Sequence, residues 1–489
     1  MSEAPAVVSL GFLADHEQQQ LTECVKRIAA TATYNEGRRS YYEAHQGIKD
    51  LGVAIPPQLK NTLIAVGWPG LVVDAVDERL DIDRLVMPGG DITSTGADVI
   101  WEANELDLLY PEAHVDALVH GVNFVAVSRG GEGQPEQVIT IEPPTTMSGI
   151  YDPRTRNLSA AASIAKNADG IITSATLYAR GETIRVARES QDGTWKVVDR
   201  DHHGFPRTMV RRMVNRPRGS RQWGRSEITT PIIGYTQSAA RTLLGSEVAR
   251  EFYGAPQRWV MGANEKDFVD EAGNKVSPWK SYMGRMLALS ADEDTGETPT
   301  VGQFAAGSPG PYIELVRMYS QLVAGEAGLP AHYLGFVTEN PASADQIRAV
   351  EARHVKRVER RQKAFGATWR GSVIDAMSLR DGEDATEMAR RMRVKWRDAG
   401  TPTKAAAADR TMKLVASGVL PADSDVVLEE LDFDETDIAR IQDDRRRSMG
   451  RNLLESIRAN ATAVEQRDPQ VTEMVSQRVP ATEPPAREG

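Results

Sequence analysis

Apolar residues recur at helical spacing through the first third of the chain. Leu21, Val25 and Ile28 share one face of a helix predicted over 15–31, because side chains three and four positions apart lie on the same side of an α-helix. Further helices are predicted over 38–51, 69–80, 91–109 and 111–119. Trp101 and Leu106 are expected to lie in the core. The N-terminal region is therefore predicted to be helical.

The pattern changes to that of a strand near residue 122. Val122, Phe124 and Ala126 would share one face of this strand, and Val125 and Val127 would share the other, since side chains alternate between the two faces of a sheet. A short, continuous apolar run with β-branched residues, as found here, predicts a strand that is buried on both faces. Further strands are predicted over 137–142, 171–179, 182–188 and 194–199. The middle of the chain is thus expected to form a small antiparallel β-rich unit.

Beyond residue 226 the chain shows long helical patterns and one polar segment. A helix over 226–252 would be about 40 Å long, and one over 342–379 about 55 Å long, at a rise of 1.5 Å per residue. Residues 255–308 are rich in glycine and turn-forming residues, and helix resumes over 311–327. A strand is predicted over 392–396, with helices over 402–417 and 436–460. The fold class is therefore α+β and mostly helical.

Composition is that of an ordinary globular protein. The chain has 489 residues, of which 40% are hydrophobic, and it contains no apolar run near the roughly 18 residues that cross a membrane. Its first residues lack the basic start and long apolar stretch of a signal peptide. We therefore expect the protein to fold in the cytoplasm where it is made and to have no membrane partner.

Charge and cysteine content narrow the classes of function. The net charge of −11 argues against tight, unspecific coating of DNA, which needs a basic surface. It does not exclude DNA that passes nearby, because an acidic surface repels the phosphate groups of DNA. The single cysteine, Cys24, can form no intrachain disulfide and no thiolate metal site by itself. Its place on the apolar face of the first helix predicts a buried packing role.

Motifs that would indicate catalysis are missing from the sequence. There is no phosphate-binding G-x-x-x-x-G-K-[ST] loop, no G-x-S-x-G nucleophile turn and no H-E-x-x-H zinc motif. His202 and His203 are adjacent, so their side chains would point apart on regular structure. The sequence therefore predicts no catalytic residue, no metal site and no cofactor.

Several short stretches occur in a characteristic order along residues 15–460. They are Tyr41-Tyr42-Glu43, Lys49-Asp50-Leu51-Gly52, Val66-Gly67-Trp68-Pro69-Gly70, Trp101-Glu102-Ala103-Asn104, His120-Gly121, Gly224-Arg225-Ser226-Glu227-Ile228, Ala255-Pro256-Gln257-Arg258, Gly328-Leu329-Pro330, Tyr333-Leu334-Gly335 and Asn340-Pro341-Ala342-Ser343-Ala344. In order and spacing the chain resembles the portal proteins of tailed bacteriophages, above all those of phages that infect actinobacteria.

This resemblance implies a portal fold in which long helices surround a central channel. The implied parts are a wing (1–225), a stem helix (226–252), a clip (253–309), a second stem helix (310–328), a tunnel loop (329–342), a long helix with a returning wing segment (343–400), a helical crown (401–465) and a mostly disordered tail (466–489).

The resemblance also implies a function. Portal subunits form a ring, typically a dodecamer, at one capsid vertex of the virion. Double-stranded DNA is packaged and ejected through its channel without sequence specificity. The implied partners are the large terminase subunit, the head–tail adaptor, the major capsid protein and the scaffold. The portal itself is not an enzyme.

Candidate functional residues follow from this architecture. The tunnel-loop candidates are Gly335, Phe336, Glu339 and Asn340. Channel-facing candidates on the stem are Arg241, Arg250 and Arg317, and partner-facing candidates on the clip are Asp292, Glu293 and Asp294.

Two questions stay open at this point. The basic run over 348–363 could contact DNA, or it could form a solvated face or an ion-pair surface between subunits, which Glu351 and Glu359 within it favour. Two rival functions also remain. One is another phage structural role, as a minor capsid or baseplate protein. The other is a nucleic-acid-processing enzyme such as a nuclease.

Overall fold

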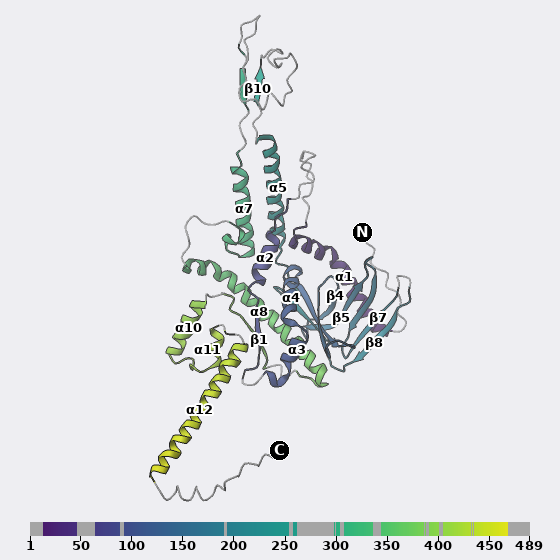
Figure 1. Ribbon diagram of the computed structural model, residues 1–489. Coiled ribbons are helices and arrows are strands. Elements are labelled where there is room, and N and C mark those ends of the chain that lie inside the picture. The colour runs from purple at the N-terminus through teal and green to yellow at the C-terminus, as the bar shows by residue number, and fades with distance from the viewer. Residues whose placement is uncertain are drawn as a thin grey trace, which may run out of the picture. The chain divides into compact units, whose positions relative to one another are not determined.

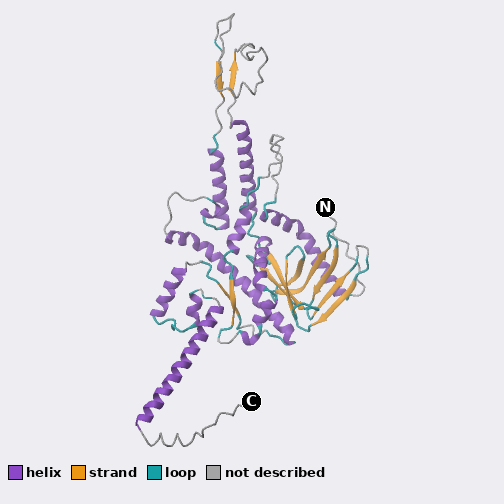
Figure 2. Ribbon diagram, viewed as in Figure 1, coloured by secondary structure: helices purple, strands orange, loops and turns teal. Residues whose placement is uncertain are grey.

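The computed structural model describes residues 13–45, 64–88, 92–189, 193–253, 258–261, 298, 300–303, 308–335, 344–385, 387, 391–400, 404–431, 433 and 435–467. The chain divides into two compact units, Met1–Gly400 and Thr401–Gly489. The first unit combines helices with antiparallel sheets, and the second is helical where it is described (Figures 1 and 2). The fold is therefore α+β, as the sequence predicts.

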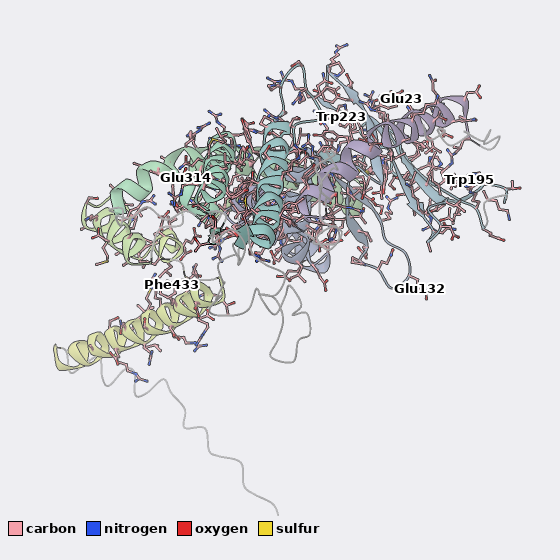
Figure 3. The ribbon with its side chains drawn as sticks, turned by 90° about the horizontal axis from the view of Figure 1, so that it is seen from above. Glu23, Glu132, Trp195, Trp223, Glu314 and Phe433 are labelled. Atoms are coloured by element: carbon pink, nitrogen blue, oxygen red, sulfur yellow. The ribbon has the colours of Figure 1, made fainter. Side chains whose placement is uncertain are left out.

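A long N-terminal helix covers a five-stranded antiparallel sheet. The helix is α1 (Asp15–Tyr42), and Figure 3 shows it, with Glu23, running across the strands. In sheet order the strands are β4 (Met147–Asp152), β5 (Asn157–Lys166), β6 (Ile172–Tyr178), β7 (Glu182–Ala187) and β8 (Lys196–His202). Leu21, Cys24 and Ile28 pack on the alanine-rich face of the sheet. The buried position predicted for Cys24 is confirmed.

A second sheet lies between the first sheet and the helices. Its order is β3 (Gln137–Glu142), β2 (Val122–Arg129) and β9 (Val210–Val214). Phe124 and Ala126 of β2 pack with residues of the five-stranded sheet. Val125 and Val127 pack into the helical core on the other side. The predicted burial of this strand on both faces is confirmed.

The main core forms around α8 (Ala344–Asp381), which packs against β2, β9, α3 (Ala97–Ala103) and α4 (Leu106–His120). Trp369 of α8 is fully buried, and its indole N–H donates a 3.0 Å hydrogen bond to Nε2 of His114. Burial lowers the pKa of His114 to about 3, so this imidazole is neutral and can accept the bond. Trp101 packs edge-on against Trp369.

Two segments far apart in the sequence close this core at one edge. The strand β1 (Ile82–Val86) pairs antiparallel with β12 (Arg393–Trp396). The short helix η2 (Thr93–Thr95) precedes α3. Arg79 donates a hydrogen bond to the carbonyl of Ala399, which ties the end of the first unit to its beginning.

Two helices leave this body side by side. They are α5 (Thr230–Tyr253) and α7 (Gly310–Ala327), which contact each other along their length (Figure 1). Beyond them, β10 (Arg258–Met261) pairs antiparallel with β11 (Thr300–Gln303). The lower ends of the two helices pack with α2 (Trp68–Asp77) and η4 (Ala331–Leu334). At 24 residues, α5 is about 36 Å long.

The second unit contains three helices in the residues described. They are α10 (Lys404–Ala416), α11 (Asp425–Glu430) and α12 (Glu435–Arg467), and each packs with its neighbour in sequence. Ser424 caps α11, because its hydroxyl accepts a hydrogen bond from the backbone N–H of Val426. Within the described part of the chain, no helix is both long and apolar enough to span a membrane.

Several predicted helix boundaries are wrong. α1 continues to Tyr42, so no separate helix begins at residue 38. The helix predicted over 91–109 is broken, because Glu105 adopts a left-handed conformation with φ of 49° between α3 and α4. Pro111 consequently lies inside α4 rather than opening it. The helix predicted from residue 226 begins instead at Thr230.

Other strands were not predicted, namely β1, β4, β5, β9, β10 and β11. The sequence of β5 contains Ala160-Ala161-Ala162, and alanine is depleted in strands. All three alanines are fully buried. Burial beneath α1 and against the neighbouring sheet favours small side chains here, so packing outweighs the intrinsic preference.

The core position of Trp369 leads to a stability prediction. Trp369→Ala is expected to lower the free energy of unfolding by about 3–5 kcal/mol, because it leaves a cavity and removes the donor to His114. Urea denaturation followed by circular dichroism measures this change. Leu108→Ala is the matched control, since Leu108 is 71% exposed and its loss should cost under about 0.5 kcal/mol. Equal effects of the two substitutions would contradict this account of the core.

Candidate functional site at the base of the α5–α7 helix pair

A buried carboxylate lies immediately before α5. Glu227 is 1% exposed, and its backbone N–H donates a 2.9 Å hydrogen bond to the carbonyl of Leu118 at the end of α4. The hydroxyl of Ser226 accepts a bond from the N–H of Ile228. These local bonds explain why the helix starts only at Thr230. The chain before α5 is fixed to the body of the protein.

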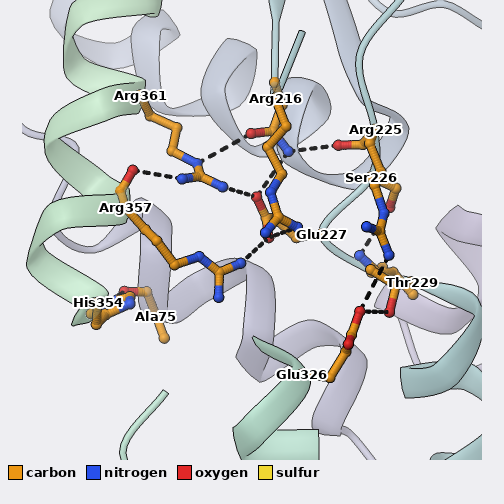
Figure 4. A network of polar contacts seen from close by, with 12 residues as sticks. Ala75, Arg216, Arg225, Ser226, Glu227, Thr229, Glu326, His354, Arg357 and Arg361 are labelled. Atoms are coloured by element: carbon orange, nitrogen blue, oxygen red, sulfur yellow. Dashed lines mark hydrogen bonds and ion pairs between the residues drawn. The ribbon is translucent and has the colours of Figure 1, made fainter. Parts of the chain in front are cut away.

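Three guanidinium groups surround this carboxylate (Figure 4). Arg361 and Arg357 reach it from α8, with Arg357 at 2.9 Å, and Arg216 reaches it from the segment after β9 at 3.4 Å. The side-chain amide of Asn215 donates a further bond of 3.0 Å to Glu227. One carboxylate therefore joins α5, α8 and the end of the three-stranded sheet.

The neighbouring charges determine the protonation state of Glu227. Burial alone would raise the pKa of Glu227, but the positive charges of Arg361, Arg216 and Arg357 outweigh burial and hold this pKa below its ordinary value. Burial lowers the pKa of Arg357 to about 10, partly offset by Glu227. At neutral pH the carboxylate is ionised and all three guanidinium groups are charged. The cluster is thus positively charged overall.

A second set of contacts ties α5 to the end of α7. Glu326 of α7 accepts hydrogen bonds from Arg225 at 3.2 Å and from the hydroxyl of Thr229 at 3.0 Å. Gly328 ends α7 with φ of 67°, and a Cβ atom added there would lie 2.4 Å from Nη1 of Arg357. A glycine is needed here both for its conformation and for space. The two helices and α8 therefore meet at one joint.

A third contact anchors the segment that follows α7. The hydroxyl of Tyr333 donates a 2.8 Å hydrogen bond to Glu351 of α8 and accepts one of 2.6 Å from Arg79. Arg79 also pairs with Glu351 at 3.2 Å. Gly335 ends η4 with φ of 87°. The chain is thus held against α8 up to residue 335.

The structure places some of the predicted site residues and not others. Gly335 lies at the end of η4, Arg241 is half-buried on α5, Arg250 is exposed and pairs with Glu247 at 2.7 Å, and Arg317 is exposed on α7. Phe336, Glu339, Asn340, Asp292, Glu293 and Asp294 lie outside the described residues. The roles assigned to all of these residues stay predictions.

Part of the basic run over 348–363 has partners within the chain. Arg357 and Arg361 point inward to Glu227, while Lys356 pairs with Glu359 at 2.9 Å on the surface. The sequence did not identify Glu227 as a central residue. The available signal was an acidic residue in Gly224-Arg225-Ser226-Glu227 before an apolar helix, but nothing in the sequence pairs it with arginines some 130 positions later.

The chemistry of the joint is electrostatic rather than catalytic. Guanidinium groups stay protonated at neutral pH, so this cluster offers no proton donor or acceptor suited to acid–base catalysis. Among the residues that the structure describes, no group of three histidine, cysteine or carboxylate side chains could hold a metal ion. The arrangement fixes the angle and position of the α5–α7 pair on the body.

Replacing the buried carboxylate tests the joint. Glu227→Gln is expected to lower the free energy of unfolding at pH 7 by about 3–5 kcal/mol, because it leaves the buried Arg361 and the partly buried Arg357 and Arg216 without a counter-charge. Glu359→Gln, which removes only the surface pair with Lys356, should cost under about 1 kcal/mol. Urea denaturation measures both. Similar losses in the two variants would contradict this account.

The same variant predicts a pH dependence. Because the folded-state pKa of Glu227 lies below its ordinary value of 4.5, its stabilisation is complete above about pH 4.5 and is lost as the pH falls through the folded-state pKa. The stability difference between the natural chain and Glu227→Gln should therefore shrink below about pH 4.5. A difference that stays constant from pH 7 to pH 3 would show that the charge of Glu227 is not what stabilises the joint.

Comparison with known proteins assigns the chain to a family. The portal protein of Mycobacterium phage L5 is 33% identical over 424 residues, which cover 85% of this chain and 86% of that protein. The portal protein of Mycobacterium phage D29 is 33% identical over 439 residues, with coverage of 87% and 89%. Both relatives come from phages of an actinobacterial genus, as the resemblance in the sequence predicts.

Solved structures and a family match complete the comparison. A chain from the neck of the native GTA particle computed with C12 symmetry is 12% identical, with a TM-score of 0.40, over 80% of this chain and 96% of that one. A chain from the virion of the native gene transfer agent is 11% identical, with the same TM-score and coverage. Residues 22–450 match the family described as phage portal protein, SPP1 Gp6-like. The chain therefore belongs to the SPP1 Gp6-like family of phage portal proteins, and its role is that of a phage portal.

Proposed function

We propose that copies of this chain form a closed ring around a channel at one vertex of a phage capsid, and that double-stranded DNA enters and leaves through it. One observation carries the proposal of a ring. Leu315, Met318 and Leu322 of α7 are 42%, 43% and 42% exposed in the single subunit. Their spacing of three and four residues puts them on one face of the helix. This apolar stripe is available for a neighbouring subunit.

A ring would bury the apolar stripe of every subunit and so be stabilised by it. Burying a leucine or methionine side chain fully stabilises a protein by about 1.5–3 kcal/mol. In a cyclic assembly the same contact recurs at every subunit boundary, and the faces of each helix are covered by two neighbours. Helical geometry puts Arg317 on a different side of α7 from the stripe. We therefore infer that Arg317 faces the channel while the stripe faces a neighbour.

The finer architecture is proposed on the same basis. We assign α5 and α7 to the stem, residues 253–309 to the clip and residues 329–342 to the tunnel loop. Residues 1–225 and the segment 343–400 would form the wing, and residues 401–465 the crown. The chain order of α5, β10, β11 and α7 supports this assignment, because a β-containing segment joins the two side-by-side helices. A twelve-fold ring is the number that the portal resemblance implies.

The proposed partners follow from these positions. The clip would dock the large terminase subunit during packaging and the head–tail adaptor afterwards. The major capsid protein and scaffold would surround the wing during assembly. DNA would be moved by the terminase rather than by this chain, which we propose has no catalytic activity. The joint around Glu227 would keep the stem at a fixed angle while DNA passes.

Purified protein tests the proposal directly. Negative-stain electron microscopy and mass photometry should show rings of about twelve subunits with a central hole. The alternatives give different results. A ring without a through-channel would indicate another structural role in the phage, and monomers that cleave DNA in the presence of a metal ion would indicate a nuclease.

Substitution within the apolar stripe tests the contact that would close the ring. Met318→Glu is expected to reduce the fraction of chains in rings at least about tenfold, because it puts a charge into a buried apolar contact. Met318→Leu, which preserves volume and apolar character, should assemble normally. Mass photometry measures assembly, and thermal unfolding of the separated subunits checks that both variants fold. Normal rings from folded Met318→Glu would exclude the stripe from the subunit boundary.

A further inference from the structure

A strongly basic pocket lies beside the Glu227 joint. Its volume is about 670 Å³, and it lies between the segment after β9 and the first half of α8. Eight of its lining residues are cationic: Arg216, Arg218, Arg225, Arg353, Lys356, Arg357, Arg360 and Arg361. None of its lining residues is acidic. So high a density of positive charge in a hollow indicates a site for an anion.

The carboxylates near the pocket do not balance its charge. Among the described residues, three carboxylates contact its cations: Glu227 contacts Arg216, Arg357 and Arg361, Glu326 contacts Arg225, and Glu359 contacts Lys356.

The remaining cations of the pocket are exposed and have no counter-charge in the part of the chain that the structure describes. Arg218, Arg353 and Arg360 form no ion pair with any residue that the structure describes. In addition, Nε and Nη1 of Arg357 are buried without a hydrogen-bond partner. Leaving buried donors of a charged group unpaired costs free energy, so an acceptor from outside this set would stabilise the pocket.

The size of the pocket limits what that acceptor can be. A hollow of this volume lies in the range of small-ligand sites, so it has room for a few side chains but not for a DNA duplex. The ligand is therefore better matched by carboxylate side chains that project from a protein surface, and guanidinium groups bind carboxylates through paired, charge-assisted hydrogen bonds.

The chain itself carries a matching surface at the end of α2. Asp74, Asp77 and Glu78 lie within one turn there, and Asp81 follows. Burial and, to a smaller extent, the neighbouring carboxylates Asp74, Asp81 and Glu78 together raise the pKa of Asp77 to about 7. Oδ1 of Asp77 is buried and has no hydrogen-bond partner among the described residues. Asp74 accepts a hydrogen bond from Tyr42, so Glu78 and Asp81, which are exposed, are the members available to a neighbour. Among the described residues none of the four carboxylates forms an ion pair.

The two surfaces lie on different sides of the subunit's central helices. Glu351 and His354 of α8 face α2, because Glu351 pairs with Arg79 and Nε2 of His354 lies 2.8 Å from the carbonyl of Ala75. At about 100° per residue, the pocket residues Arg353, Lys356 and Arg360 point to another side of that helix. No ion pair joins these three cations to the acidic end of α2 among the residues that the structure describes.

We propose that the pocket binds the carboxylates at the acidic end of α2 from the next copy of the chain. The contact is head-to-tail, since it joins two different surfaces of identical subunits, and such a contact can close into a ring. This inference rests on the proposed ring and identifies a charged contact that would set its register. It would act beside the apolar stripe of α7 and add specificity to that contact.

Charge reversal on each side tests the pairing. Arg353→Glu with Arg360→Glu, and separately Glu78→Arg with Asp81→Arg, should each raise the concentration needed for assembly by about tenfold or more. The combined chain, with all four substitutions, should assemble within about threefold of the natural protein. Mass photometry at physiological salt measures assembly. Arg154→Glu with Lys166→Glu is the matched control, because it reverses two exposed cations of the five-stranded sheet.

Each contrary outcome has a distinct meaning. Unchanged assembly of Arg353→Glu with Arg360→Glu would overturn the role of the pocket, and failure of the combined chain to recover would overturn the pairing with α2. A lower melting temperature of the separated Arg353→Glu, Arg360→Glu subunit would place the anion within its own chain. Loss of binding to a short DNA duplex, with assembly unchanged, would assign the pocket to nucleic acid.

The proposed function can fail separately. Natural oligomers that respond to both reversals but never close into a ring in electron micrographs would contradict the proposed function and still support the pairing.

Discussion

The buried carboxylate of Glu227 is the interaction on which the arrangement of the long helices depends. It lies where α4, α5, α8 and the end of the three-stranded sheet meet, and three guanidinium groups compensate its charge. A charge buried so completely is tolerated only when it is paired and hydrogen-bonded. Helix α8, which supplies Arg357 and Arg361, and the segment after β9, which supplies Arg216, are therefore held in position by the same ion pairs that keep the carboxylate ionised. This gives the α5–α7 pair a rigid base.

Three surface features of the subunit favour contacts with other copies of the chain. Excess positive charge remains in the pocket beside the joint, an apolar stripe remains on α7, and acidic residues remain at the end of α2. Each is unbalanced in a single subunit, and in the proposed ring each would be complemented by a second copy. A ring assembled from these contacts would be acidic overall, with its cations confined to particular positions. Such a surface suits a conduit that DNA must pass through without binding tightly.

Much of the fold could be predicted from the sequence, because local patterns determine it. The alternation over 122–127 predicts β2 and its burial on both faces, and the long helical pattern over 342–379 predicts α8. The alanine-rich β5 was missed because its choice of residues reflects the elements packed on it. The site was harder to predict, since Glu227 and Arg361 are 134 positions apart and only the fold brings them together. The resemblance to portal proteins supplied the function, which no local motif reveals.

The central claim is that α5 and α7 stand around a hole that only several copies create. A cryo-electron microscopy reconstruction of the purified assembly tests it most directly. The account predicts a pierced ring in which both helices line the wall and Leu315, Met318 and Leu322 are covered by the adjacent subunit. Density in which the two helices pack inside a solitary body, or around a closed centre with no passage, would contradict it.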